Sequence, residues 1–185
     1  MASELNGLRV AFLVSNEGIE QAELTAPWEA VREAGGTPVL IAPEPGEVQG
    51  FNHLTPADKF PVDHMFGEVS HSEYGAVVIP GGVANSDLLR TVPDAVSFVR
   101  GIFATGKPAA VICHGPWLLV EAGLTEGRTL TSWPSLQTDI RNAGGSWVDT
   151  EVQICPAGPN TLITSRKPDD LPVFCSTLTQ VFAKH

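Results

Sequence analysis

A cysteine followed at once by a histidine, Cys113 and His114, is the pair of side chains in this sequence best suited to covalent chemistry. A thiolate is a strong nucleophile, and an imidazole exchanges a proton near neutral pH. The pair follows the apolar run 109–112 and precedes Gly115 and Pro116, which suit a tight turn and the first turn of a helix. We therefore predict a strand, a sharp turn and a helix, a nucleophile elbow with cysteine in place of serine.

The thiol of Cys113 is expected to be reactive at this turn. Free N–H groups at the start of a helix favour negative charge, so we expect the pKa of the thiol to be lowered. Two alternatives stay open. In the first, Cys113 is simply a small, buried apolar side chain. In the second, His114 caps the helix or stacks and does not act as a base. His114 is the best available general base, but neighbours in sequence face one another only if the backbone adopts the unusual elbow conformation.

Two carboxylates begin the first predicted helix, at the carboxyl end of the first predicted strand. Ligands bind outside the carboxyl ends of the strands in open α/β sheets, so Glu20 and Glu23 are expected to reach the crevice that holds Cys113. One of them is expected to hydrogen-bond the thiol. The alternative is a structural one, because carboxylates are favoured in the first turn of any helix.

A glycine-rich turn follows the apolar strand 76–79 and is expected at the same edge of the sheet. The backbone N–H groups of Gly81, Gly82 and Val83 are candidate donors to a developing oxyanion, together with the N–H of His114. The predicted site therefore combines a thiol, a base, carboxylates and backbone donors.

The elements that must position these groups follow from the spacing of apolar residues. Apolar runs predict strands, and steps of three and four predict helices. A strand, a helix and a strand within 8–42 make a βαβ unit with a right-handed crossover, so we predict a doubly wound, mostly parallel sheet with helices on both faces. Residues 43–74 are expected to be irregular, with one hairpin around 48–54. The predicted strands are 8–15, 37–42, 76–79, 109–112, 128–131, 147–154 and 161–164, and the helices are 20–34, 94–105, 116–122, 134–143 and a last one ending near 183.

Composition excludes several classes of function. A chain of 185 residues with 43% hydrophobic residues suits one folded domain over 1–185. The net charge of -10, with 11 scattered lysines and arginines, argues against nucleic acid as a partner. No apolar run approaches the length of a membrane span and the start lacks a secretion signal, so we expect a cytoplasmic protein without membrane contact.

Cysteine and histidine usage points to free thiols in a reducing compartment. Three cysteines without C-x-x-C spacing, and five histidines without an i, i+4 pair, predict neither a disulfide framework nor a metal site. We also expect no cofactor. Cys175 shares a helical stripe with apolar residues, which favours a core position, and Cys155 has no evident partner.

Several short motifs in order along nearly the whole chain resemble one family. The chain is similar to the PfpI-type intracellular proteases and general stress proteins, within the class I glutamine amidotransferase-like superfamily that also holds the Parkinson-associated deglycase-like proteins. The resemblance implies a flavodoxin-like fold. The motifs are FLV at 12–14, EQAEL at 20–24, VIPGG at 78–82, ICHGP at 112–116, TSWP at 131–134 and SRKPDDL at 165–171.

The resemblance implies a role for individual residues. Cys113 matches the family nucleophile and His114 its base, while Glu23 matches the glutamate that hydrogen-bonds the thiol, with Glu20 as the second choice. In the family an acid in the loop after Pro-Gly-Gly reaches the histidine of a partner subunit, and Asp87 is the match here.

The same resemblance implies a homodimer or a higher homo-oligomer, and an aromatic residue, Trp133, lining the site. Its implied substrates are small carbonyl compounds, glycated adducts or peptides. We favour a stress-associated thiol enzyme acting on carbonyls, because nothing suggests a long peptide groove. A redox sensor that oxidises Cys113 is the alternative. Glutamine amidotransfer is disfavoured, because that chemistry needs a late histidine and only His185 follows His114.

Overall fold

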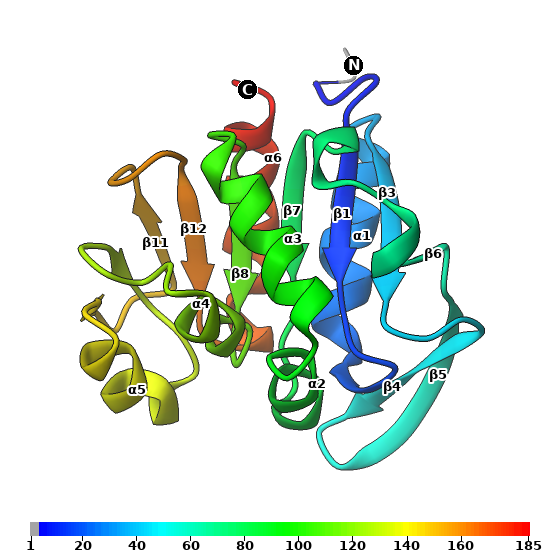
Figure 1. Cartoon of the computed structure of the whole chain (residues 1–185), viewed down its shortest axis with the longest axis horizontal. Helices are drawn as coiled ribbons and strands as arrows, with labels where there is room; N and C mark the ends of the chain where they lie inside the picture. Colours follow the sequence, from blue (N-terminus) through cyan, green and yellow to red (C-terminus); the bar gives the residue numbers. More distant parts are fainter. Residues whose placement is uncertain (1–3) are drawn as a thin grey trace.

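A seven-stranded sheet runs through the centre of the computed structural model, which describes residues 4–185 (Figure 1). Its strand order is β11-β12-β8-β7-β1-β3-β6, and every neighbouring pair is parallel except β11 with β12. The predicted doubly wound, mostly parallel sheet is therefore confirmed. The strands are β1 (Arg9–Leu13), β3 (Thr37–Ala42), β6 (His64–Met65), β7 (Ala76–Ile79), β8 (Ala109–Ile112), β11 (Val152–Cys155) and β12 (Leu162–Ser165).

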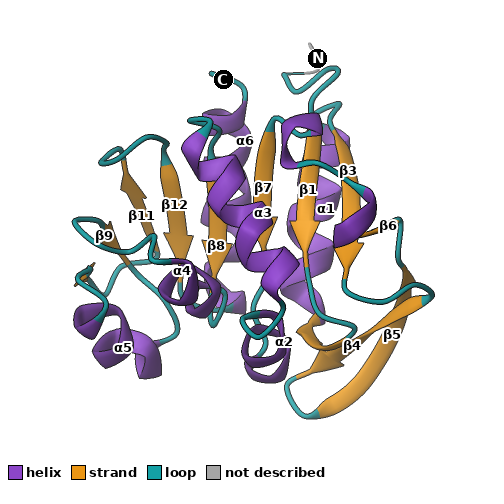
Figure 2. Ribbon diagram, in the orientation of Figure 1, coloured by secondary structure: helices purple, strands orange, loops and turns teal. Residues whose placement is uncertain are grey.

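Helices cover both faces of this sheet because its central strands are apolar on both sides (Figure 2). Successive residues of β7 alternate between the two buried clusters, with Val77 in one and Val78 in the other. Phe98 belongs to the first cluster and Phe174 to the second. The first face carries α3 (Pro93–Ala104) and α4 (Pro116–Ala122), and the second carries α1 (Gln21–Glu33) and α6 (Leu171–Phe182).

The carboxyl ends of β1, β7 and β8 meet at one edge of the sheet, the lower edge in Figure 1, and the two termini lie at the opposite edge. β1 pairs with β3 on one side and with β7 on the other, so the chain reverses its direction of winding there. Ligands of doubly wound folds bind at this kind of switch point. The elbow at residue 113 and the turn after Ile79 therefore share this edge.

A second, three-stranded sheet flanks that edge. The expected hairpin is present as β4 (Glu47–Asn52) and β5 (Thr55–Pro61), and β4 also pairs in parallel with β2 (Glu17–Glu20). The sequence did not indicate β2, because a four-residue strand with Gly18 at a φ of 84° lacks an apolar pattern. The remainder of 43–74 holds β6 and two short 3-10 turns, Phe66–Glu68 and His71–Glu73.

The structure corrects three other expectations. Residues after Pro80-Gly81-Gly82 form a helix, α2 (Val83–Leu89), where only a turn was expected, because its Asn, Ser and Asp residues also favour turns. The predicted strand 147–154 is two strands, β10 (Ser146–Trp147) and β11, in different sheets. The predicted helix 134–143 is a 3-10 turn followed by α5 (Gln137–Asn142), and β10 pairs with β9 (Thr129–Leu130).

In the described part of the chain, residues 4–185, no helix combines the length and the apolar character that crossing a membrane requires.

Candidate active site

Cys113 occupies the left-handed region of backbone space, with a φ of 63°, directly after β8. That conformation costs a non-glycine residue roughly 1–2 kcal/mol, so the surrounding structure must hold it. Two hydrogen bonds do so. The Cys113 N–H donates to the Ser165 carbonyl (3.0 Å), and the Cys113 carbonyl accepts from the Trp133 N–H (2.9 Å). The predicted sharp turn between strand and helix is present.

Glycines around the elbow allow a close approach of backbone to backbone. A Cβ on Gly81 would overlap the Glu23 carboxylate and the Cys113 Cβ. A Cβ on Gly115 would lie 2.9 Å from the carbonyl oxygens of Ile79 and Ile112, closer than a carbon atom can approach. Cys113 therefore sits in a turn whose glycine positions have no room for larger residues.

His114 faces the thiol of its neighbour, because the elbow turns the two side chains toward each other. Its Nδ1 lies 3.2 Å from Cys113 Sγ. The ring stacks on Trp133, with centroids 5.7 Å apart, and meets Trp117 edge-on at 5.3 Å. Burial lowers the pKa of His114 to about 4, so the ring is neutral at pH 7 and able to accept a proton.

Glu23 reaches the same point from the first turn of α1 and is fully buried. Its Oε2 accepts a hydrogen bond from the Gly81 N–H at 2.9 Å. Burial raises the pKa of Glu23 to about 8, and the hydrogen bond to Cys113 opposes this only in part. At neutral pH the carboxyl group therefore holds a proton. Its Oε1 has no hydrogen-bond partner among residues 4–185 and is the oxygen free to carry it.

The lowered thiol pKa expected from the helix start is wrong for this environment. Burial raises the pKa of Cys113 well above its usual value, and a charge on Glu23 raises it further. The backbone N–H groups of Gly82 and His114 act in the opposite direction. α4 is only seven residues long, so its dipole does little. Protonation of Glu23 removes the charge repulsion, so the two groups share protons as a coupled pair.

The thiol and the imidazole open onto a pocket of about 510 Å³. Every residue predicted for the site lines this pocket except Gly81. Two of them stand apart from the thiol. Glu20 accepts a hydrogen bond from the His53 N–H (3.1 Å), and Asp87 is an exposed residue of α2. The lining residues are Gly18, Glu20, Glu23, Phe51, His53, Leu54, Gly82, Val83, Ala84, Asp87, Cys113, His114, Trp117, Trp133 and Pro168.

The backbone donors are divided between two tasks. The N–H of Gly81 donates to Glu23, which leaves the N–H groups of Gly82 and His114 as those that face the sulfur. Val83 begins α2 and is 56% exposed at the mouth of the pocket. The sequence pattern did not separate these amides, because the division depends on where Glu23 points.

Buried Asn85 fixes α2 against the sheet edge. Its Oδ1 accepts from the Ser15 N–H at 2.7 Å, and its Nδ2 donates to the Gly81 carbonyl at 3.0 Å. Gly82, at a φ of 95°, packs so closely on β2 that a Cβ there would overlap the Gly18 carbonyl. The glycine turn, β2 and α2 therefore form one tightly joined wall of the pocket.

Several pocket residues were not identified from the sequence. Trp117, four residues after Cys113, lines the pocket from the first turn of α4, and that spacing was an available signal. Phe51, His53 and Leu54 come from the β4–β5 hairpin, which gives no sequence sign of its proximity to Cys113. Leu54 is 94% exposed at the tip of the hairpin.

The remaining cysteines lie away from this pocket. Cys155 is buried, and its sulfur accepts a hydrogen bond from the Thr129 N–H at 3.4 Å. Cys175 packs against the core on α6, and burial raises the pKa of its thiol to about 11. Within the described range 4–185, no three histidine, cysteine or acidic side chains gather as metal ligands do.

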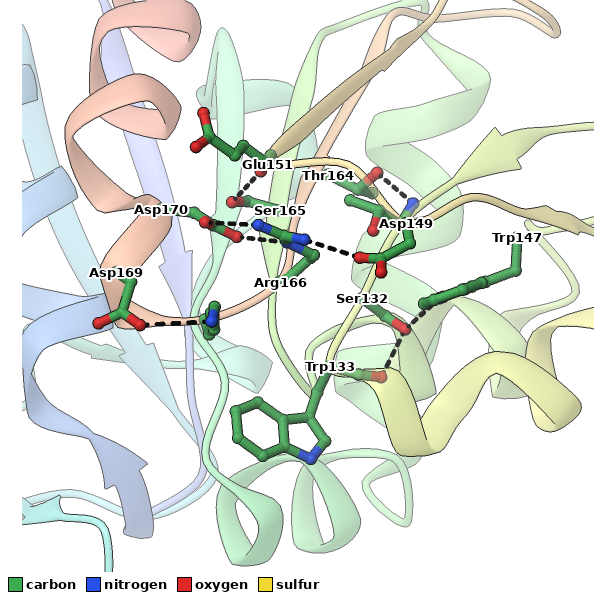
Figure 3. A network of polar contacts seen from close by, with 12 residues as sticks. Ser132, Trp133, Trp147, Asp149, Glu151, Thr164, Ser165, Arg166, Asp169 and Asp170 are labelled. Carbon is green, nitrogen blue, oxygen red and sulfur yellow. Dashed lines mark hydrogen bonds and ion pairs between the residues drawn. The ribbon is translucent and has the colours of Figure 1, made fainter.

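A network of polar contacts at the end of β12, the strand next to β8, supports the elbow (Figure 3). Ser165, which receives the Cys113 N–H, donates its hydroxyl to the Glu151 carbonyl. Arg166 pairs with Asp170 at 2.8 Å and with Asp149 at 2.7 Å. These contacts tie the end of β12 to the start of α6, so the acceptor for Cys113 has a fixed position.

Comparison with known proteins gives a consistent result. The model of the DJ-1/PfpI family matches residues 8–181. A deglycase of Pyrococcus horikoshii is 38% identical over 89% of this chain and 93% of its own length. General stress protein 18 of Bacillus subtilis is 38% identical over 84% and 87%. Protein/nucleic acid deglycase 2 of Escherichia coli is 36% identical over 90% and 92%.

Solved structures share the fold. The DJ-1 protein of Schizosaccharomyces pombe has a TM-score of 0.80 at 22% identity, covering 94% of this chain and 90% of its own. A two-domain protein of Anabaena variabilis, with DJ-1/ThiJ/PfpI-like and ferritin-like domains, has a TM-score of 0.84 at 31% identity; the match covers 94% of this chain and 47% of that one. The motif resemblance is thus confirmed over nearly the whole sequence, and the chain belongs to the DJ-1/PfpI family.

Proposed function

We propose that this protein is a thiol enzyme that acts on reactive carbonyl compounds or on their adducts, with Cys113 as nucleophile and His114 as base. The observation that carries the proposal is the 3.2 Å approach of a neutral imidazole nitrogen to a thiol at the wall of a pocket. Five relatives named as deglycases, including those of Pyrococcus horikoshii and Escherichia coli, support it.

The first step is addition of the thiol to a carbonyl carbon. The Cys113 proton passes to Nδ1 of His114, a bond forms between sulfur and carbon, and the π electrons of the carbonyl move to its oxygen. The imidazolium then gives its proton to that oxygen, which leaves a neutral thiohemiacetal. The low pKa of His114, about 4, makes this return of the proton favourable.

The groups around the sulfur have complementary roles in this step. The N–H groups of Gly82 and His114 face the reacting centre and are the donors for the developing oxyanion. Glu23, protonated at neutral pH, contacts the thiol without placing a second negative charge beside it. Its neutral form is therefore the one that favours nucleophilic attack.

The pocket supports a small substrate. A volume of about 510 Å³ accommodates a short carbonyl compound or one modified side chain. Trp133 and Val83 offer apolar surface, and Glu20 and Asp87 line the pocket as carboxylates. For a 2-oxoaldehyde, addition followed by a hydrogen shift within the substrate and by hydrolysis consumes one water and gives one 2-hydroxy acid. Peptide hydrolysis, suggested by a relative named a putative cysteine protease, uses the same nucleophile.

We also propose that the active form is a homodimer or a larger homo-oligomer. In support, Asp87 is exposed on α2 beside the pocket, where it is available to the His114 of a second copy. Leu88, the next residue of the same helix, is an apolar side chain that is 46% exposed. Sedimentation of wild type and of Leu88→Asp tests this: a monomeric wild type contradicts it.

A redox sensor is the second candidate, and one observation favours it. The unpartnered, buried Oε1 of Glu23 is available to donate a hydrogen bond to an oxidised sulfur. In that reaction a hydroperoxide oxidises the Cys113 thiol to a sulfenic acid and is itself reduced to an alcohol or water. The two candidates differ in turnover, because a sensor consumes no carbonyl substrate catalytically.

A substrate panel tests both candidates. Aldehydes, 2-oxoaldehydes, glycated amino acids and short peptides are incubated with wild type, Cys113→Ser and Cys175→Ser, and 2-hydroxy acid or free amine is quantified. We expect Cys113→Ser to lose at least about a thousandfold in kcat/KM, because the nucleophile is absent. Cys175→Ser, a matched change of a half-buried thiol outside the pocket, should keep wild-type activity.

Two outcomes would reject the proposed enzyme. Undiminished turnover by Cys113→Ser rules out the thiol mechanism. Absence of any turnover by wild type, with stoichiometric oxidation of Cys113 by mild peroxide in mass spectra, favours the sensor instead.

A further inference from the structure

The ring of His114 lies between two tryptophans, and no carboxylate among residues 4–185 forms a hydrogen bond with it. Trp133 stacks on one face, with an interplanar angle of 24°, and Trp117 meets the ring at 62°. Aromatic pairs at these separations are attractive and directional. The position of the base therefore depends on what holds the two indoles in place.

Trp133 is held through both of its peptide groups. Its N–H donates to the Cys113 carbonyl, and its own carbonyl accepts from the Ser132 hydroxyl at 2.8 Å. The same hydroxyl accepts from the indole N–H of Trp147 at 2.9 Å, so the three residues form a chain (Figure 3). Ser132 is fully buried, which makes an unpaired hydroxyl there costly. The chain sets where the indole of Trp133 lies.

Trp117 is held from the same part of the sequence. Its indole N–H donates to Oδ2 of Asp139 in α5 at 2.9 Å, and the guanidinium of Arg90 lies over its ring at 5.6 Å. α5 and β10 are in contact with each other. Both indoles are thus fastened by residues between 132 and 147, a segment outside the central sheet.

We propose that this segment positions the base: Ser132, Asp139 and Trp147 orient His114 by fixing the two indoles between which its ring lies. The inference rests on the proposed function only for its kinetic consequences, because the orientation of the ring toward Cys113 is a property of the resting protein. None of the three is a catalytic residue, since each acts through a tryptophan.

The two indoles and the three residues that fix them, together called the clamp, also exclude water from the His114 ring. Loosening the clamp therefore changes the pKa of His114. The titratable groups that face the base are Cys113, and across the pocket Glu20, Glu23 and Asp87. Arg90 and Asp139 reach it only through Trp117. Variants that leave all these charges in place, such as Trp147→Phe and Ser132→Ala, isolate the effect of the clamp.

The test uses three sets of variants. Trp147→Phe and Ser132→Ala, singly and together, break the chain to Trp133. Asp139→Ala removes the acceptor of Trp117, whereas Asp139→Asn keeps an oxygen at that position. Trp28→Phe is the matched control for loss of an indole, since Trp28 packs on Phe12 in the cluster on the other face of the sheet.

Three readouts follow each variant. Steady-state kinetics on the best substrate give kcat and KM, the alkylation rate of Cys113 by iodoacetamide is followed by mass spectrometry, and an NMR titration gives the pKa of His114. We expect kcat and the alkylation rate to fall about fivefold to tenfold with KM within twofold. The pKa of His114 should rise from about 4 toward its ordinary value as water reaches the ring.

The pattern across variants decides the proposal. The double variant should equal Ser132→Ala alone, Asp139→Asn should recover most of what Asp139→Ala loses, and Trp28→Phe should match wild type. An unchanged His114 titration and alkylation rate in folded Trp147→Phe and Ser132→Ala overturns the clamp. Alkylation and NMR need no turnover, so failure of the proposed function with these two shifts present leaves the clamp supported and rejects only the enzyme.

Discussion

Two residues other than glycine adopt a positive φ among residues 4–185, and their surroundings differ sharply. Cys113, at 63°, is buried beneath the glycines of two turns, and both of its peptide hydrogen bonds go to neighbouring segments. His53, at 57°, lies at the tip of the β4–β5 hairpin, where its side chain is 82% exposed. The backbone is similarly strained at both residues. Neighbouring segments hold it in place at the elbow, whereas few contacts do so at the hairpin tip.

The contrast extends to the carboxylate beside each residue. Glu23 contacts the elbow from a fully buried position, while Glu20 accepts the His53 N–H at the edge of the pocket. The two glutamates are three residues apart, and full burial raises the pKa of Glu23 to about 8. The strained backbone at Cys113 is held by many surrounding contacts, so substitutions near it should change the free energy of unfolding strongly. Substitutions at the hairpin tip should change it little.

The largest effect is expected from Glu23→Gln, measured as unfolding free energy against pH. The pKa of Glu23 is about 8 in the folded state and 4.5 for an unperturbed glutamate, so between these pH values the folded state holds a proton that the unfolded state has lost. Stability of wild type therefore falls as pH rises through this window. The variant has no such proton, so its stability relative to wild type should rise by several kcal/mol from pH 4.5 to 8. Parallel curves for the two proteins would contradict a buried, protonated Glu23.

A smaller but still large effect is expected from Gly115→Ala. Gly115 has a φ of -49°, which alanine adopts freely, so the cost comes only from the contact of the new Cβ with backbone oxygens. We expect a loss of about 2–4 kcal/mol in the free energy of unfolding by urea denaturation. Gly67→Ala is the control, because a Cβ there meets no atom within 4 Å, and its stability should change by less than about 0.5 kcal/mol. Equal stability of the two variants would mean that the elbow is not closely packed.

The smallest effect is expected at the hairpin tip. Asparagine tolerates the left-handed region better than histidine, and the backbone N–H that Glu20 accepts is retained, so His53→Asn should stabilise the protein by at most about 0.5 kcal/mol. Thermal unfolding followed by circular dichroism is sufficient to measure it. A loss of more than about 1 kcal/mol would show that the tip is as constrained as the elbow, and the contrast between the two residues would fail.

Local sequence patterns predicted the elements that carry the elbow, because short apolar runs and helix signals act within a few residues. β7, β8 and α4 have the predicted bounds. β2 and α2 were missed because tertiary contacts stabilise them, chiefly those of Asn85 and the approach of Gly18 to α2. The sequence supplied the candidates at the site, but the choice of partner for each amide and the direction of the thiol pKa depend on burial, which no local pattern encodes.

The close approach of Gly18 and Gly82 has a consequence for mutational tolerance. A side chain on Gly82 would overlap the Gly18 carbonyl, and one on Gly18 would come within 2.7 Å of the Asn85 backbone nitrogen. A substitution at one of these glycines therefore cannot make room for a side chain at the other. Any compensating change must move β2 or α2 as a whole. Directed evolution of a larger or differently shaped pocket should therefore leave this pair untouched. The positions open to variation are Leu54 and Val83, whose exposed side chains border the same pocket.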